Sequence, residues 1–137
     1  MIKDRFKFRF WNKSKNRYIN TEKLVLNDRT YTQVGTKRMN NGTYCSYIVN
    51  EYNTSDIIPE QCTGLKDKNG KPIYDGDIVR TSGCYKDGVY IISWNEDDAE
   101  YDLYNKDNYF IYQLVNRFNS VEVIGNIHEN ADLIKVG

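Results

Sequence analysis

Residues 61–80, QCTGLKDKNGKPIYDGDIVR, hold more turn-forming pairs than any other segment of this chain of 137 residues. Asn69-Gly70 is the pair most typical of a tight β-hairpin turn. Asp75-Gly76 is a second turn pair, and Ile78-Val79 then provide the β-branched side chains that favour a strand. The segment therefore predicts a tight turn with positive φ at Gly70, and a second reversal of the chain at Gly76.

The composition and the hydrophobic pattern both favour strands over helices. The chain has 12 Tyr, 5 Phe and 2 Trp, and no stretch keeps a helical period of 3.6 residues for three turns. From residue 59 onward, short apolar runs alternate with turns, which suits a small, strongly bent barrel of the SH3 type. We predict an all-β protein with an N-terminal β subdomain (1–58) and an SH3-like barrel (59–137), joined by an extended linker at 55–62.

Two further segments of the N-terminal half carry structural predictions. The polar residues 35–43 are expected to form a loop, and Tyr44–Tyr52 is expected to form a strand. Residues 5–11, RFKFRFW, alternate strictly between two faces. This pattern predicts a half-buried strand whose core face carries Phe6, Phe8 and Phe10.

The opposite face of that first strand is basic and is the candidate binding site. Its residues are Lys3, Arg5, Lys7, Arg9 and Trp11. Positive charges can follow the phosphates of a nucleic acid, and an indole can stack on a base. The alternative is an ordinary solvated sheet face, with Trp11 turned into the core. The pattern leaves both interpretations open.

The net charge is zero, with 19 Lys and Arg against 19 Asp and Glu, but the charges are unevenly distributed. Residues 1–23 hold eight basic and two acidic residues, a net charge of +6. Residues 94–107 hold one basic and six acidic residues, a net charge of −5. Such asymmetry can steer a charged partner, or the two segments can compensate each other.

The cysteine content indicates a reducing compartment. Three cysteines without a C-x-x-C spacing exclude a full disulfide framework and argue against a zinc site. The N-terminus has no apolar run typical of a signal peptide, and no window approaches 18 apolar residues. We therefore expect reduced thiols, a cytoplasmic location and no membrane partner.

Candidate catalytic groups are few. Asp67, Asp75 and Asp77 could do acid–base work, but aspartate beside glycine is also ordinary turn chemistry. His128 is the single histidine and is expected at the surface, beside a short helical turn. An acidic cluster follows the apolar run 89–94 and could bind a divalent metal or form a solvated hairpin loop. Its members are Glu96, Asp97, Asp98, Glu100 and Asp102. We expect no cofactor and no enzymatic activity.

Three segments resemble the YopX family of phage and prophage proteins. They are the opening FKFRFWNKSKNRY (6–18), the segment CTGLKDKNGKPIYDGDIV (62–79) and the end VEVIGNIHENADL (121–133). The family more often has proline where Ala131 stands, and residues 81–115 match no motif. The resemblance implies a β protein with an N-terminal β subdomain and an SH3-like barrel, in the cytoplasm of a bacterial host. It implies no catalytic residues, because the family's function is unassigned.

Three function classes follow from these observations. The first is a non-enzymatic binding module for nucleic acid or for a host protein. The second is a structural or oligomer-forming protein, since tyrosine-rich sheets make good interfaces. The third is a metal-dependent hydrolase that uses the acidic residues 96–102. We predict the first, with Asn69, Gly70, Asp75 and Gly76 as structural turn residues.

Overall fold

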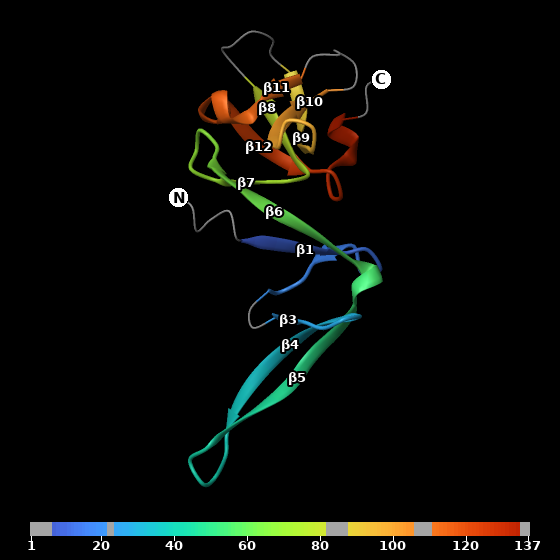
Figure 1. The fold of residues 1–137 in the computed structure, drawn as a ribbon, viewed down its shortest axis with the longest axis vertical. Coiled ribbons are helices and arrows are strands. Elements are labelled where there is room, and N and C mark those ends of the chain that lie inside the picture. Colours follow the sequence, from blue (N-terminus) through green and yellow to red (C-terminus); the bar gives the residue numbers. More distant parts are fainter. Residues whose placement is uncertain (1–6, 22–23, 82–87, 106–110, 135–137) are drawn as a thin grey trace. The chain divides into compact units, whose positions relative to one another are not determined.

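The computed structural model of the chain is all-β (Figure 1). It describes residues 7–21, 24–81, 88–105 and 111–134, with only the backbone of residues 111 and 112. Most of the described residues lie in strands, and they contain short 3-10 turns but no α-helix. The all-β prediction is confirmed.

The strands follow one another along the chain with short connections. They are β1 (Phe8–Asn12), β2 (Arg17–Tyr18), β3 (Leu24–Leu26), β4 (Thr30–Arg38), β5 (Tyr44–Asn53), β6 (Ile57–Lys66), β7 (Pro72–Tyr74), β8 (Asp77–Thr81), β9 (Gly88–Asn95), β10 (Glu100–Tyr104), β11 (Ile111–Gln113) and β12 (Val121–Asn126). The 3-10 turns are η2 (Thr54–Asp56), η3 (Leu114–Asn116), η4 (Phe118–Ser120) and η5 (Ala131–Ile134). The sheet orders are β2-β1-β6-β7, β3-β4-β5 and β11-β10-β9-β8-β12.

The chain divides into two compact units. Unit 1 comprises Met1–Phe8 with Glu60–Gly137, and unit 2 comprises Arg9–Pro59. From the sequence, unit 2 has eight basic and four acidic residues and unit 1 has eleven and fifteen, so their net charges are +4 and −4.

Unit 1 is built on the five-stranded antiparallel sheet, in which β12 returns beside β8 after the 3-10 turns η3 and η4. The apolar run predicted as a central strand is β9, and it lies between β8 and β10. Alternate residues of the curled sheet point inward to the core of unit 1. Fully buried core residues are Ile73, Val79, Tyr90, Ile92, Leu103, Leu114 and Val121.

Unit 2 has a smaller core and a long two-stranded hairpin. Its buried residues are Ile19, Tyr31 and Ile57, with Phe10, Leu24 and Tyr52 packed against them. β4 pairs with β5 along its whole length, whereas β3 covers only Tyr31–Gln33 of β4. In Figure 1 the outer ends of β4 and β5 run on together beyond β3.

Two predicted segments differ from the structure. Residues 35–38 were expected in a loop but extend β4, because each of them pairs with a residue of β5. The ring of Tyr47 lies over Gly35. A Cβ at residue 35 would be only 2.6 Å from Cζ of Tyr47, so packing of this ring explains the glycine within the strand. The expected linker at 55–62 is mostly strand β6, since its backbone groups join a sheet.

Candidate functional site

The turn between β6 and β7 is built around the side chain of Asp67. Its Oδ1 accepts hydrogen bonds from the backbone N–H groups of Asn69 and Lys71, both at 2.9 Å. The N–H of Gly70 donates to the Asp67 carbonyl oxygen at 3.0 Å. Gly70 has φ of +82°, which confirms the predicted left-handed turn residue.

Asp67 also connects this turn to β12. Its Oδ2 accepts the N–H of Val123 at 2.9 Å, and the N–H of Lys68 donates to the carbonyl of Val121 at 3.0 Å. Burial alone would raise the pKa of Asp67. The hydrogen bonds from Val123, Lys71 and Asn69, with the charge of Lys71, outweigh burial and lower the pKa. Both carboxylate oxygens are thus used by the backbone, which favours the turn role over acid–base work.

Gly76 occupies the second reversal and has φ of +87°. Its N–H donates to the carbonyl of Ile92 at 2.9 Å, and its carbonyl accepts the N–H of Ile127 at 3.0 Å. A Cβ at this position would lie 2.6 Å from Oε2 of Glu60. The predicted reversal is confirmed, and the missing side chain leaves room for a buried carboxylate.

The other two aspartates of this segment, Asp75 and Asp77, differ from each other in burial. Asp77 is buried, and its Oδ2 accepts the N–H of Tyr74 at 2.8 Å. Asp75 is half-buried.

The buried Glu60 and the half-buried His128 form an acid–imidazole pair in unit 1. Oε2 of Glu60 lies 2.9 Å from Nε2 of His128, and the two side chains are 5% and 14% exposed. His128 was expected at the surface, and the structure places it half-buried. The reason is the loop after β12, in which Oδ1 of Asn126 accepts the N–H of His128 and fixes its position. The burial of Glu60 leaves little access for a substrate.

The structure describes three members of the predicted basic face. Lys3 and Arg5 lie outside the described residues, and Lys7 is exposed. The guanidinium of Arg9 lies 4.9 Å from the centre of the Tyr18 ring. Trp11 is only 5% exposed and packs edge-on against the same ring, with the ring centres 4.9 Å apart. The indole is therefore packed inside the protein, as the alternative interpretation has it, and is not presented to a base.

The core face of the first strand also differs from the prediction. Phe6 lies outside the described residues, and Phe10 packs against Tyr31 with the ring centres 5.2 Å apart. Phe8, which was expected in the core, is 43% exposed. Phe8 begins β1, whereas the residues that pair with β2 lie at the other end of the strand. The alternation of the sequence therefore overstates the length of the buried face.

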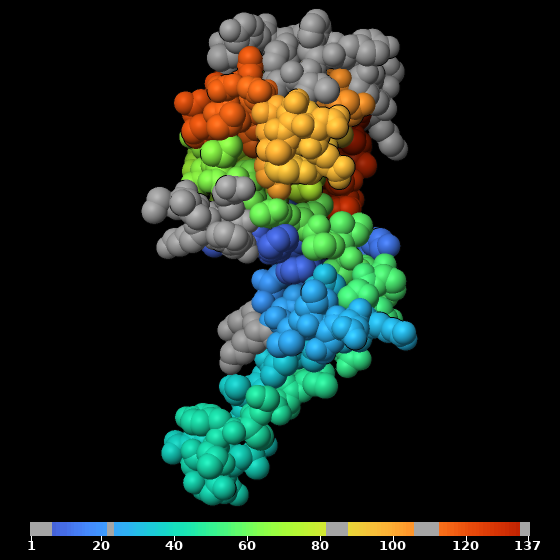
Figure 2. All heavy atoms as spheres, in the orientation of Figure 1, coloured from blue at the N-terminus to red at the C-terminus, as the bar shows by residue number. Residues whose placement is uncertain are grey.

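The outer part of the β4–β5 hairpin, residues 36–51, is called the arm below. Every residue of the arm is exposed, although several of its side chains are large and apolar. They are Met39, Tyr44, Tyr47, Ile48 and Val49, with exposed fractions of 44% to 71%. In Figure 2 the tip of the arm, in teal, stands out from the rest of unit 2. Sequence reasoning predicted the strand Tyr44–Tyr52 but not the exposure of both its faces.

The acidic cluster lies at the β9–β10 turn and on β10. Glu96, Asp97 and Asp98 are exposed, whereas Asp102 is 4% exposed. Within the described part of the chain, no group of three or more His, Cys, Asp or Glu residues has an arrangement that could hold a metal ion. A divalent cation at residues 96–102 therefore gains no support from the geometry.

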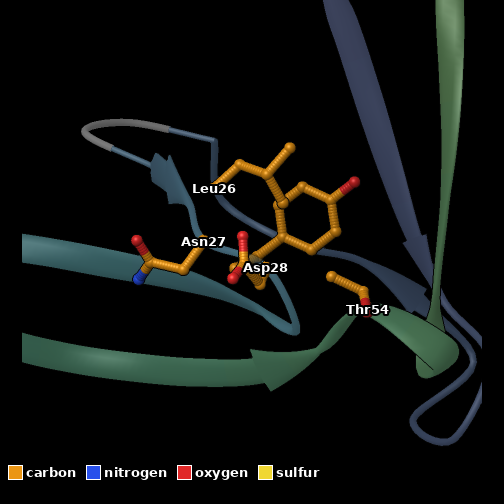
Figure 3. Close-up of a pocket in the computed structure, with 5 residues that line it drawn as sticks. Leu26, Asn27, Asp28 and Thr54 are labelled. Carbon is orange, nitrogen blue, oxygen red and sulfur yellow. The ribbon is translucent and has the colours of Figure 1, made fainter.

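A wide hollow of about 710 Å³ lies in unit 2 (Figure 3). It is lined by Leu26, Asn27, Asp28, Tyr31 and Thr54. Leu26, Asn27 and Asp28 are exposed, and Figure 3 shows the Asn27 amide pointing away from Thr54. Ligand sites usually bring several polar groups together inside a largely apolar cleft. This hollow does not show that pattern.

Two other predictions concern the cysteines and the membrane. Cys45 is exposed and Cys62 is buried, and both are free thiols; Cys84 lies outside the described residues. Among the residues that the structure describes, no helix is long and apolar enough to cross a membrane.

Comparison with known proteins identifies the family. A sequence model described as YopX protein matches residues 7–135. The crystal structure of protein EF1440 from Enterococcus faecalis is similar, with a TM-score of 0.63 and 25% identity, over 94% of this chain and 97% of that chain. The crystal structure of yopX from Bacillus subtilis has a TM-score of 0.58 and 17% identity, over 96% and 99% of the two chains. No curated protein matches. The chain belongs to the YopX family.

Proposed function

We propose that this chain is a non-enzymatic binding module and that the arm docks on a partner protein. The observation that supports this proposal is the exposure of the apolar arm residues. Tyr44 is 71% exposed, Ile48 is 63% exposed and Tyr47 is 51% exposed. Large exposed apolar side chains gathered on one element mark protein interaction surfaces more often than random surface. Tyrosine and methionine are also enriched in such interfaces.

The backbone of the arm supports the same proposal. A two-stranded hairpin is at best marginally stable by itself in water. In the order β3-β4-β5, the strand β5 is an edge of the sheet over its ten residues. An edge strand presents N–H and C=O groups to which an extended segment of another protein can add. Strand addition to β5 would also cover the apolar side chains beside it.

The charges of the arm indicate the kind of partner. Lys37 and Arg38 are exposed near the tip, and Glu51 is the single acidic residue of the arm. The register places Arg38 opposite Tyr44 and Val34 opposite Ile48, so these four side chains share one face of the hairpin. A complementary partner offers an extended edge strand or an apolar groove with acidic side chains at its rim.

The test compares two double variants of the full-length chain. Tyr44→Ser with Ile48→Ser removes the exposed apolar groups of one arm face. Val115→Ser with Leu133→Ser is the matched control, because these side chains are 57% and 40% exposed but lie outside the arm. A partner captured from host cells is identified, purified and titrated against all three proteins by calorimetry. The arm variant should lose at least tenfold in affinity, and the control should bind as the parent does.

Two outcomes would contradict the proposal. One is equal affinity of the partner for the parent and the arm variant. The other is self-association of the parent, measured by light scattering, that the arm variant abolishes while no other protein binds. The second result would favour the structural, oligomer-forming class instead. Unfolding of each variant in urea shows whether it is folded, and exposed positions should change stability little.

Nucleic acid is a second candidate partner, because the turn between β1 and β2 is basic. Lys13, Lys15 and Arg17 are all exposed there, and unit 2 carries a net charge of +4. Binding through phosphates should weaken steeply as salt increases. A labelled oligonucleotide is titrated at roughly 50 mM salt, with Lys13, Lys15 and Arg17 changed together to Ser. Equal binding by the triple variant, or no binding by the parent, would exclude this surface.

We also propose that unit 1 is an SH3-like barrel and that the chain has no enzymatic activity. The first proposal is supported by the sheet order β11-β10-β9-β8-β12. The strands β8 to β11 form a meander, and β8 also pairs with the last strand, β12. The second is supported by the backbone contacts of the Asp67 carboxylate and the burial of Glu60. Metal-dependent nuclease or phosphatase turnover that disappears with Asp97→Ala and Asp98→Ala would overturn it.

A further inference from the structure

One face of β10 places two carboxylates beside a third from the preceding turn. Glu100 and Asp102 lie two residues apart on the strand, so both side chains leave the same face of the sheet. Leu103, on the opposite face, is fully buried in the core of unit 1. The register places Glu100 opposite Asn95, and places Asp102 between Ser93 of β9 and Gln113 of β11. Asp98, in the preceding turn, is the third member of what we call the carboxylate cluster.

Amide groups supply the hydrogen bonds that the carboxylate cluster receives. Nδ2 of Asn95 donates to Oδ2 of Asp102 at 2.8 Å and to Oδ2 of Asp98 at 3.2 Å. Nε2 of Gln113 lies 3.3 Å from Oε1 of Glu100. The other polar atom of Asn95, Oδ1, accepts the N–H groups of Asp97 and Asp98. The side-chain amide of Asn95 therefore already makes two hydrogen bonds as a donor and two as an acceptor.

One oxygen of this cluster has no partner. Asp102 is 4% exposed, and its Oδ1 is the buried side-chain oxygen that accepts no hydrogen bond in the described part of the chain. Burying a carboxylate oxygen without a donor is costly. No ion pair involving a member of the cluster is formed within the described residues. A donor or a positive charge is needed at this position, and the described acidic residues have no metal-binding arrangement.

We propose that a proton fills this position: Glu100 is protonated and donates its O–H to Oδ1 of Asp102. One proton then removes one negative charge from the cluster and satisfies the unpartnered oxygen at the same time. A carboxylic acid beside a carboxylate makes a short, charge-assisted hydrogen bond.

The electrostatics agree with this assignment. Burial, the side-chain contact with Asp102 and the negative charges of Asp102 and Asp98 raise the pKa of Glu100, and the hydrogen bond from Gln113 opposes the rise. The neighbours on β9 and β11, Ser93, Asn95 and Gln113, are uncharged, and η3 holds only uncharged residues. The turn adds Glu96, Asp97 and Asp98, which are all acidic, while residues 106–110 lie outside the described part.

The sign of the pH dependence follows. Because the folded-state pKa of Glu100 is raised, the folded chain holds this proton at a higher pH than the unfolded chain does. The contribution to stability is complete below the ordinary pKa of glutamate, about 4.3, and is lost as pH rises through the raised folded value. The β9–β10–β11 part of unit 1 should therefore be held more firmly in mild acid than at alkaline pH.

The test uses NMR titration of the side-chain carboxyl carbons in the full-length chain. The carboxyl of Glu100 should titrate at a clearly higher pH than the ordinary value for a glutamate, about 4.3. Glu100→Gln keeps a donor and removes the charge, so its urea midpoint should exceed that of the parent at pH 8. It should also lack the decline that the parent shows as pH rises above the ordinary pKa of glutamate, about 4.3. Glu96→Gln removes the same charge from the same turn and should keep that decline.

Three results would overturn the proposal. One is titration of the Glu100 carboxyl at the ordinary value for a glutamate, about 4.3. Another is a decline in stability that Glu100→Gln and Glu96→Gln both keep or both lose. The third is stabilisation of the parent by millimolar Ca²⁺ or Mg²⁺ that Glu100→Gln abolishes, which would show that the cluster takes a metal ion instead of a proton. The NMR titration is measured on the parent chain. It therefore tests the proposal even if a variant fails to fold.

Discussion

Removal of the Asp67 carboxylate should be among the most damaging single changes outside the apolar cores. Asp67→Ala deletes the acceptor of three backbone N–H groups, those of Asn69, Lys71 and Val123. It also disconnects the β6–β7 turn from β12. Residues 69 and 71 are exposed, so water can replace Asp67 there, whereas Val123 is half-buried.

The magnitude follows from these three contacts. Hydrogen bonds to a charged group contribute about 1.5–3 kcal/mol each, and a buried donor left unsatisfied costs about 1–3 kcal/mol. With two of the three donors rehydrated, we expect Asp67→Ala to lower the free energy of unfolding by roughly 2–4 kcal/mol. Asp67→Asn keeps one carbonyl oxygen but turns an amide N–H toward a backbone donor. It should therefore lose about 1–3 kcal/mol.

The same carboxylate predicts a pH dependence. The folded-state pKa of Asp67 is lowered. Its contribution to stability is therefore present above the unfolded pKa, about 3.9, and is lost as pH falls through the lower folded value. The parent should lose stability in that acidic range, and Asp67→Asn should lose less over the same range.

The assay is urea unfolding followed by tryptophan fluorescence, at pH 7 and at intervals down to pH 2.5. Asp132→Asn is the matched control, because Asp132 is exposed in η5. The control should have the stability of the parent at pH 7. An Asp67→Ala variant with the stability of the parent at pH 7, or an Asp67→Asn variant with the parent's full acid dependence, would refute the structural role given to this residue.

Two further predictions concern glycines and core packing. Gly70 and Gly76 both have positive φ, but only at Gly76 is there no room for a side chain. A Cβ at 76 would lie 2.6 Å from Oε2 of Glu60, whereas a Cβ at 70 meets nothing within 4 Å. Gly76→Ala should therefore destabilise the protein more than Gly70→Ala. We expect roughly 1 kcal/mol for Gly70→Ala and about 3 kcal/mol or more for Gly76→Ala in urea unfolding; equal losses would contradict the close approach. Leu103→Ala should lower the free energy of unfolding by about 2–5 kcal/mol, because Leu103 is fully buried. Leu26→Ala should lower it little, because Leu26 is 62% exposed. Equal effects would show that the core is misplaced.

Much of the local structure is readable from the sequence. Gly70 and Gly76 could be predicted at positive φ, because that conformation is a property of the glycine and its immediate neighbours. The run 89–94 could be predicted as a central strand, since a strand flanked on both sides is apolar without interruption. The strand at Tyr44 could be predicted from its β-forming side chains, and the structure extends it to Asn53.

The contacts that define the candidate sites are not readable in the same way. Alternation placed Trp11 on a basic outer face, but the ring of Tyr18 covers it. Glu60 and His128 are 68 residues apart, and no local pattern predicts their contact. The one available signal for the role of Asp67 was its place directly before an Asn-Gly turn, where an aspartate often accepts backbone N–H groups.

The sequence by itself determined the all-β class, the two turns of residues 61–80 and most strand positions, because φ preferences and a period of two residues are short-range properties. The tertiary structure decided which faces are covered. It left both faces of the arm exposed, buried the Asp102 oxygen without a donor and packed Glu60 against Gly76 and His128. Burial and hydrogen bonding depend on groups that are distant in the chain, so those features exist only once the sheets have formed.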